Sequence, residues 1–244
     1  MEQLPEKITP DNLKDTVVEY RFLSDMPHEV LPGVIFRELE GTFTLLPRPS
    51  AAAIWQLDPQ RSIQFGGNES VQFVNESVKI QLADRSLVFN SLDIYPGWRQ
   101  YSKCINDVLD NLFKKGVLKS ISRIGIRYIS EYPSMSIFEV MNERPVLSLP
   151  HGEGQNITYR TEVRKDDFTI VLNVADRVSR QGGVLSEAFF SLIDIDVFSA
   201  FPHPLTNPEA VLEATDNLHK IEKEVFFGIL KAEYIETLNP EYKL

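Results

Sequence analysis

Two segments that lie 106 residues apart carry nearly the same pattern, and this match constrains the fold more than any other feature. Residues 20–27 (YRFLSDMP) match residues 126–133 (IRYISEYP) at a constant offset (126 − 20 = 106), with three identical positions. Both segments are rich in the β-branched and aromatic residues typical of strands, and both end in a proline. The match indicates either an internal duplication or a coincidence between two strand-to-turn segments.

The order of the expected elements repeats as well. Each half starts with a strand, continues through a short helical stretch and several strands with tight turns, and ends in a long amphipathic helix. The first long helix begins near Trp98, where apolar residues recur at steps of three and four. The second follows Asn207 and Pro208, which suit the N-cap and the first helical position.

We therefore predict an α+β protein of two similar β-α-β(3–4)-α halves, each an antiparallel sheet covered by a long helix. A duplication like that of the TATA-binding protein is one such arrangement. The predicted divisions are a flexible N-terminal arm over residues 1–13, a first half over residues 14–117 and a second half over residues 118–244. Pro202 and Pro204 are expected to end the last strand.

The charge and the cysteine content exclude several classes of protein. The chain has 25 basic and 35 acidic residues, a net charge of −10, which disfavours binding to nucleic acid. Cys104 is the only cysteine, so neither an internal disulfide nor a zinc site of several thiolates can form. The sequence has no signal-peptide pattern and no apolar run of about 18 residues, which predicts a cytoplasmic protein without a membrane span.

Four charged side chains in two apolar strands are the candidate binding residues. Arg123 and Arg127 are in phase on one strand, and Asp194 and Asp196 are in phase on the last long strand. Charges within apolar strands are costly to bury unless they are paired. Two interpretations stay open: these residues form ion pairs or face solvent, or they line a groove that binds a ligand or a charged side chain of a partner.

The remaining candidates favour structural roles. His219 and Glu222 share a helix face, but no further metal ligand lies near them in the sequence. Cys104 lies beside apolar helix positions without a neighbouring base, as a packed cysteine does. Residues 151–156 (HGEGQN) match neither a phosphate loop nor a dinucleotide fingerprint. The sequence therefore predicts no catalytic residue, no metal and no cofactor.

Several short motifs together resemble a known family. They are Tyr95-Pro96 before a helix, the strand of residues 123–129, the run LIDID at residues 192–196, and a terminal helix with Leu218-His219 and Phe226-Phe227. This combination resembles a family of uncharacterised, sporadically distributed bacterial proteins of about this length. The resemblance implies a bacterial cytoplasmic protein with the patchy occurrence of accessory or defence-linked genes. It implies no activity and no site residues.

Two hypotheses about function follow from these observations. The first is a non-enzymatic protein-binding or accessory protein, linked to defence or immunity, that binds a protein partner or associates with itself. The second is a small-molecule binder or enzyme with a pocket between a curved sheet and a helix, in which Arg123, Arg127, Asp194 and Asp196 are the polar anchors. Because many active sites assemble from scattered residues, the lack of a motif argues only weakly against an enzyme.

Overall fold

The structure is a computed structural model that describes residues 4–46, 70–92, 94–142, 148–150, 152–153, 157–178 and 189–242. None of the helices in these ranges is long and apolar enough to cross a membrane. The elements, in chain order, are β1 (Leu13–Leu23), α1 (Leu31–Leu39), β2 (Thr44–Leu45), β3 (Val71–Val74), β4 (Val78–Ala83), β5 (Ser86–Ser91), α2 (Trp98–Lys114), β6 (Ser120–Pro133), α3 (Ile137–Val140), β7 (Ser148–Leu149), β8 (Gly152–Glu153), β9 (Ile157–Lys165), β10 (Phe168–Val178), β11 (Phe190–Leu205), α4 (Pro208–Ile229) and α5 (Ala232–Thr237).

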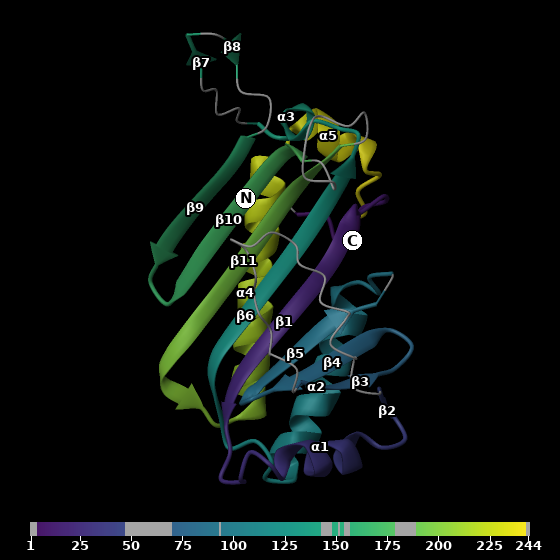
Figure 1. Cartoon of the computed structure of the whole chain (residues 1–244), viewed down its shortest axis with the longest axis vertical. Helices are drawn as coiled ribbons and strands as arrows, with labels where there is room; N and C mark the ends of the chain where they lie inside the picture. The colour runs from purple at the N-terminus through teal and green to yellow at the C-terminus, as the bar shows by residue number, and fades with distance from the viewer. Residues whose placement is uncertain are drawn as a thin grey trace. The chain divides into compact units, whose positions relative to one another are not determined.

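The described strands form one antiparallel sheet of nine strands, in the order β2-β3-β4-β5-β1-β6-β11-β10-β9, and a separate β7-β8 pair (Figure 1). The prediction of two similar β-α-β(3–4)-α halves, each with its own helix-covered sheet as in the TATA-binding protein, is therefore wrong. The reason is that β1 and β6, the first strands of the expected halves, are neighbours. The backbone N–H of Lys119 donates to the carbonyl of Leu23, and that of Glu131 donates to the carbonyl of Asn12, both at 2.9 Å. This pairing satisfies backbone groups that would otherwise form two open edges.

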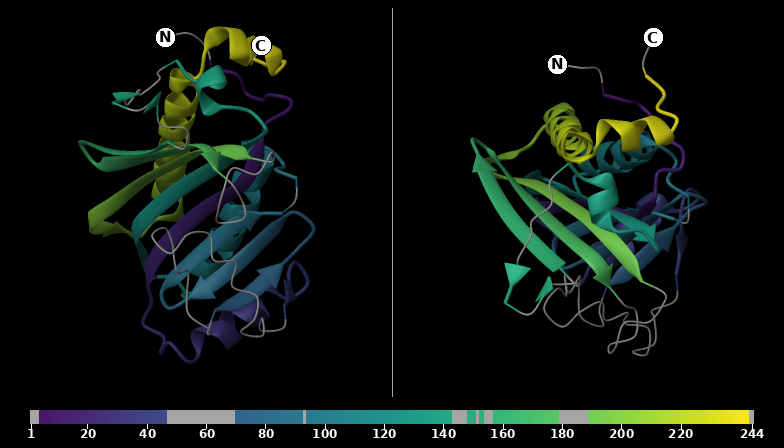
Figure 2. Two further views of the ribbon diagram at one scale, coloured as in Figure 1. Left: turned by 45° about the horizontal axis from the view of Figure 1, so that its top comes forward. Right: turned by 90° about the horizontal axis from the view of Figure 1, so that it is seen from above.

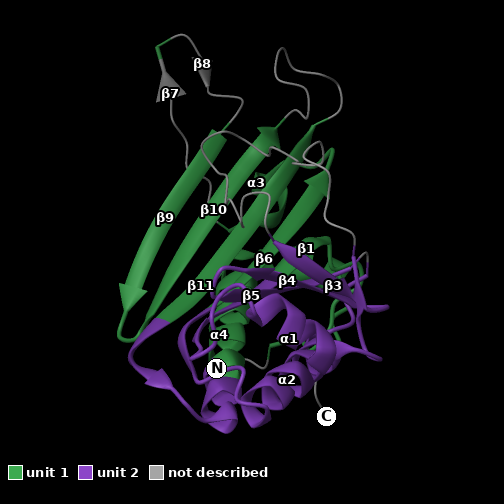
Figure 3. Cartoon of the chain, turned by 60° about the horizontal axis from the view of Figure 1, so that its bottom comes forward, with its two compact units in different colours: residues 1–16, 125–199, 215–244 green, residues 17–124, 200–214 purple. Residues whose placement is uncertain are grey.

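The chain divides into two compact units (Figure 3). Unit 1 contains residues 1–16, 125–199 and 215–244, and unit 2 contains residues 17–124 and 200–214. The predicted division into residues 1–13, 14–117 and 118–244 stays a prediction. Within unit 1, the described part of the expected N-terminal arm has backbone partners, because the N–H groups of Glu6 and Thr9 donate to the carbonyls of Glu241 and Leu238, both at 2.6 Å.

The core of unit 2 forms where α2 packs against β5. The predicted helix at Trp98 is confirmed, and its apolar stripe is the buried face of α2. The phenol of buried Tyr101 donates to the backbone carbonyl of Phe89 at 2.8 Å, and Tyr20 of β1 contacts the ring of Phe89 edge to face. Gly116, which follows the helix with φ of 67°, adopts the left-handed conformation that ends many helices.

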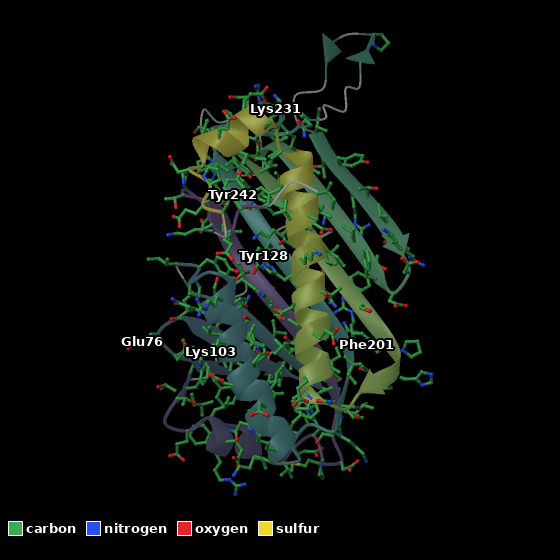
Figure 4. The ribbon with its side chains drawn as sticks, turned by 180° about the vertical axis from the view of Figure 1, so that it is seen from behind. Glu76, Lys103, Tyr128, Phe201, Lys231 and Tyr242 are labelled. Atoms are coloured by element: carbon green, nitrogen blue, oxygen red, sulfur yellow. The ribbon has the colours of Figure 1, made fainter. Side chains whose placement is uncertain are left out.

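The core of unit 1 lies between its strands and α4. Seen from above, the strands of unit 1 form one layer and α4 lies against one side of it (Figure 2). Figure 4 shows the same helix crossing the back of the strands, with Tyr128 beside it. The predicted N-cap is confirmed: the side chain of Asn207 accepts a hydrogen bond from the backbone N–H of Glu209 at 2.9 Å.

The last strand of the sheet differs from its prediction at one end. Pro202 and Pro204 were expected to end it, but β11 continues to Leu205. Proline lacks the N–H donor, yet its fixed φ is compatible with extended backbone where no ladder bond is needed from that residue. The expected strand residues 184–188 and the expected strand at residues 62–66 lie outside the described residues.

Candidate functional site

The alternation of β6 decides where its charged side chains point. Consecutive strand residues face opposite sides, so Arg127 and Tyr128 lie on different faces of the sheet. Tyr128 faces α4, since its ring centroid lies 5.6 Å from that of His219. Arg127 therefore points away from α4. We call this side of the strands the polar face of unit 1, defined by Arg127, Asn173, Asp194 and Asp196.

A bidentate ion pair occupies the centre of the polar face. Nε and a terminal nitrogen of Arg127 donate to the two carboxylate oxygens of Asp194, at 2.7 and 2.9 Å. The side-chain amide of Asn173 donates to the same carboxylate at 3.1 Å. The side chains of Arg127 and Asp194 are only 19% and 6% exposed. A planar fork that meets a carboxylate in this way is among the strongest and most directional ion pairs in proteins.

Charge reinforces this geometry. Burial would lower the pKa of Arg127, but the hydrogen bond and charge of Asp194 raise it, and the charges of Asp196 and Asp15 raise it further. The net effect is a pKa above the ordinary value for arginine. The guanidinium is therefore permanently charged, and cannot give up a proton in any reaction near neutral pH.

Arg123 belongs to a different group of charges. It forms an ion pair with Glu19 of β1, and both residues belong to unit 2. The same carboxylate accepts hydrogen bonds from Arg21 at 3.2 Å and from the hydroxyl of Ser86 at 3.1 Å. Of the four predicted site residues, the structure thus joins Arg127 with Asp194 and gives Arg123 a partner that was not predicted.

The placement bears on the two hypotheses about function. A pocket between sheet and helix needs its polar anchors on the side that α4 covers. Arg127 and Asp194 lie on the other side, and they are paired with each other. The first interpretation of these residues, as paired charges within the sheet, matches this arrangement. Glu19 is a charged residue in the apolar first strand, and this pattern could have identified it as a candidate. Its pairing with Arg123, about 100 residues later in the chain, leaves no signal in the local sequence.

A second polar network in unit 1 was missed by the sequence analysis. Buried Asp176 accepts hydrogen bonds from the hydroxyls of Ser136 and Ser191, at 2.9 and 3.1 Å, and from the backbone N–H of Ile137 at 2.7 Å. Ser136 and Glu139 also form a capping box at the start of α3. The S-x-x-E spacing was a usable signal for the cap. The network ties α3 to β10 and β11, which is a structural role.

The two candidate metal ligands, His219 and Glu222, both lie on α4. Glu222 is buried on α4, and burial raises its pKa to about 8. Burial, with a contribution from Lys223, lowers the pKa of neighbouring His219 to about 3. The part of the chain that the structure describes contains no group of three or more His, Cys, Asp or Glu residues that could hold a metal ion. Residue His151 and the loop at residues 154–156 lie outside it.

Cys104 of unit 2 has a thiol whose pKa is raised above the ordinary value. Burial is the main cause that raises its pKa, although the amide of Asn75, 3.8 Å from Sγ, acts in the opposite direction. A raised pKa reduces the thiolate fraction on which nucleophilic attack depends.

Comparison with known protein families and with curated proteins finds no match to this chain.

Proposed function

We propose that this chain is a non-enzymatic protein-binding or accessory protein, and that the polar face of unit 1 binds its partner. The acidic groups around Arg127 support the proposal most directly, because Asp194, Asp196 and Asp15 all act on one guanidinium, which Asp194 already pairs at 2.7 and 2.9 Å. A guanidinium held in this way can act neither as a general acid nor as a nucleophile. Three carboxylates around one guanidinium leave this face acidic, which suits recognition by another protein.

The expected partner carries a basic surface. Three carboxylates, those of Asp194, Asp196 and Asp15, act on the single guanidinium of Arg127, and the whole chain has a net charge of −10. Electrostatic complementarity then favours a positively charged protein and disfavours the phosphate backbone of nucleic acid. The resemblance to sporadically distributed bacterial proteins supports an accessory role, linked to defence or immunity, in the bacterial cytoplasm.

Affinity capture with matched variants tests this proposal. Tagged wild-type protein, an Asp196→Asn variant and a Lys220→Ala control are expressed in the native cell, and their co-purifying proteins are quantified by mass spectrometry. Asp196→Asn removes a charge from the polar face at nearly constant volume, whereas Lys220 is an exposed residue of α4. We expect a stoichiometric partner with the wild type and the control, and about a fivefold to thirtyfold weaker recovery with Asp196→Asn.

The captured partner is then purified, and its binding is measured by calorimetry at low and high salt. A basic partner gives weaker binding at high salt. The proposal is wrong if no stoichiometric partner is recovered, or if the partner binds Asp196→Asn as tightly as the wild type. Equal melting temperatures of the three proteins show that the variants are folded.

A further inference from the structure

The strand β9 ends the nine-stranded sheet at one side, and one of its edges has no pairing strand among the described residues (Figure 1). Its nine residues, Ile157–Lys165, pair with β10 in one unbroken register, from Phe168↔Lys165 to Asp176↔Ile157. The strand contains no proline and no bulge, two of the features that prevent an edge from adding a further strand, and its charged side chains alternate in sign. Its backbone is therefore regular enough to continue the sheet.

The side chains of β9 divide into two faces of different character. Arg160, Glu162 and Arg164 alternate along one face, where Glu162 lies 3.9 Å from Arg160 and 2.9 Å from Arg164. Tyr159 and Val163 lie on the other face and are 43% and 49% exposed, among the most exposed large apolar side chains described. An edge with exposed apolar residues on one face and alternating charge on the other indicates a pairing site.

We propose that β9 pairs with the β9 strand of a second copy of this chain, antiparallel and with Thr161 on the two-fold axis. A two-fold axis perpendicular to the sheet pairs each residue before Thr161 in one copy with the residue equally far after Thr161 in the other copy. Since Thr161 is the middle residue of Ile157–Lys165, all nine residues find a partner in this register. Arg160 then lies opposite Glu162 of the second copy, and Tyr159 lies opposite Val163, each pair occurring twice.

Neighbouring registers are worse for reasons that can be read from the same residues. An axis at Arg160 opposes arginine to arginine, and an axis at Glu162 opposes the two glutamates and also Arg160 to Arg164. An axis at Tyr159 or Val163 avoids like charges but pairs only five residues of the strand. Directly opposed side chains, about 4.5–5.5 Å apart at Cβ, interact more strongly than diagonal ones at about 7–8 Å, so the opposed pairs decide the register.

A second copy of the chain complements both the charged face and the apolar face of β9. A flexible peptide of another protein can add to an edge, but a second copy also supplies the charge order and the apolar residues that complement β9. The contact is a strand edge about 30 Å long, which places it among the smaller, reversible interfaces. We therefore expect a concentration-dependent equilibrium between monomer and dimer.

Charge-swap variants of the full chain test the register by sedimentation velocity, from micromolar to near-millimolar concentration. Arg160→Glu and Glu162→Arg each turn both opposed pairs into like charges, and we expect about tenfold to thirtyfold weaker dimerisation. Mixing the two variants restores opposite charges at both positions, so the mixture is expected to form a heterodimer. The double swap in one chain is expected to dimerise like the wild type. Lys220→Glu, a charge reversal on α4, is the control.

A second measurement fixes the axis. In a Cys104→Ala background, Thr161→Cys places two thiols at opposed positions, where Cα atoms lie about 4.5–5.5 Å apart and a disulfide can form. Thr158→Cys places them about 20 Å apart in the same register, so it should remain unlinked under mild oxidation. A wild type that is monomeric at every concentration overturns the proposal. So does a mixture of the two charge-swap variants that forms no heterodimer, or equal cross-linking at residues 158 and 161.

Discussion

Replacing Glu222 by glutamine is expected to remove a pH dependence that this carboxyl imposes on the stability of the fold. Glu222 is 3% exposed on α4, and burial raises its pKa from 4.5 to about 8, against a smaller opposite effect of Lys223. The folded-state pKa lies above the unfolded value. The contribution to stability is therefore fully present below pH 4.5 and is lost as the pH rises through about 8.

The magnitude follows from the two pKa values. One pKa unit corresponds to about 1.36 kcal/mol, so the change from 4.5 to about 8 limits the cost of ionisation to about 5 kcal/mol. Relative to low pH, ionisation of Glu222 lowers the free energy of unfolding by about 1 kcal/mol at pH 5 and by about 4 to 5 kcal/mol at pH 8.5. The free energy of unfolding of the wild type should therefore fall by about 4 kcal/mol relative to Glu222→Gln between these two pH values.

Urea unfolding followed by circular dichroism at pH 5, 7 and 8.5 measures this difference. Neutral His219, whose pKa is lowered to about 3 by burial, is present in both proteins, so its own pH dependence cancels. Glu224→Gln is the matched control, because Glu224 is on the same helix but its side chain is 44% exposed. Parallel stability profiles of the wild type and Glu222→Gln from pH 5 to 8.5 would refute the reasoning.

Two further substitutions test the polar contacts of the interior. Asp176→Ala removes the acceptor of three hydrogen bonds, including that of Ser136, and leaves buried donors unsatisfied; it should reduce the free energy of unfolding by about 3 kcal/mol. A loss below about 1 kcal/mol in thermal unfolding would contradict the assigned role. Tyr101→Phe removes only the bond to the carbonyl of Phe89 and should cost about 1 to 2 kcal/mol in urea unfolding, with no change in the circular dichroism spectrum.

Local patterns predicted the elements well and their assembly poorly. The helix at Trp98 could be found because its apolar residues recur within a few turns, and the cap at Asn207 is a property of neighbouring residues. The pairing of β1 with β6 depends on backbone groups that every residue carries, so no side-chain pattern encodes it. For this reason the sequence led to two separate sheets where the structure has one.

The candidate site was predicted to a similar extent. Strand alternation placed Arg127 in phase with Arg123 on one strand and Asp194 in phase with Asp196 on another, because charged residues in apolar strands are conspicuous. It did not show that Arg127 binds Asp194, nor that Arg123 has Glu19 as its partner, since both contacts depend on strand order. The network around Asp176 joins residues from three separate segments, and no single stretch of sequence contains its pattern.

Unit 1 is built from three separate segments of the chain, and this has a consequence for biosynthesis. A ribosome delivers the chain from its N-terminus, so residues 17–124 of unit 2 are complete while most of unit 1 is still missing. Residues 1–16 are made before residues 17–124 but must wait for residues 125–199, and the apolar side of these strands stays uncovered until residues 215–244 are made. The nascent protein therefore exposes an aggregation-prone surface until residues 215–244 have been made. Chaperones that bind extended apolar segments are expected to act during this interval.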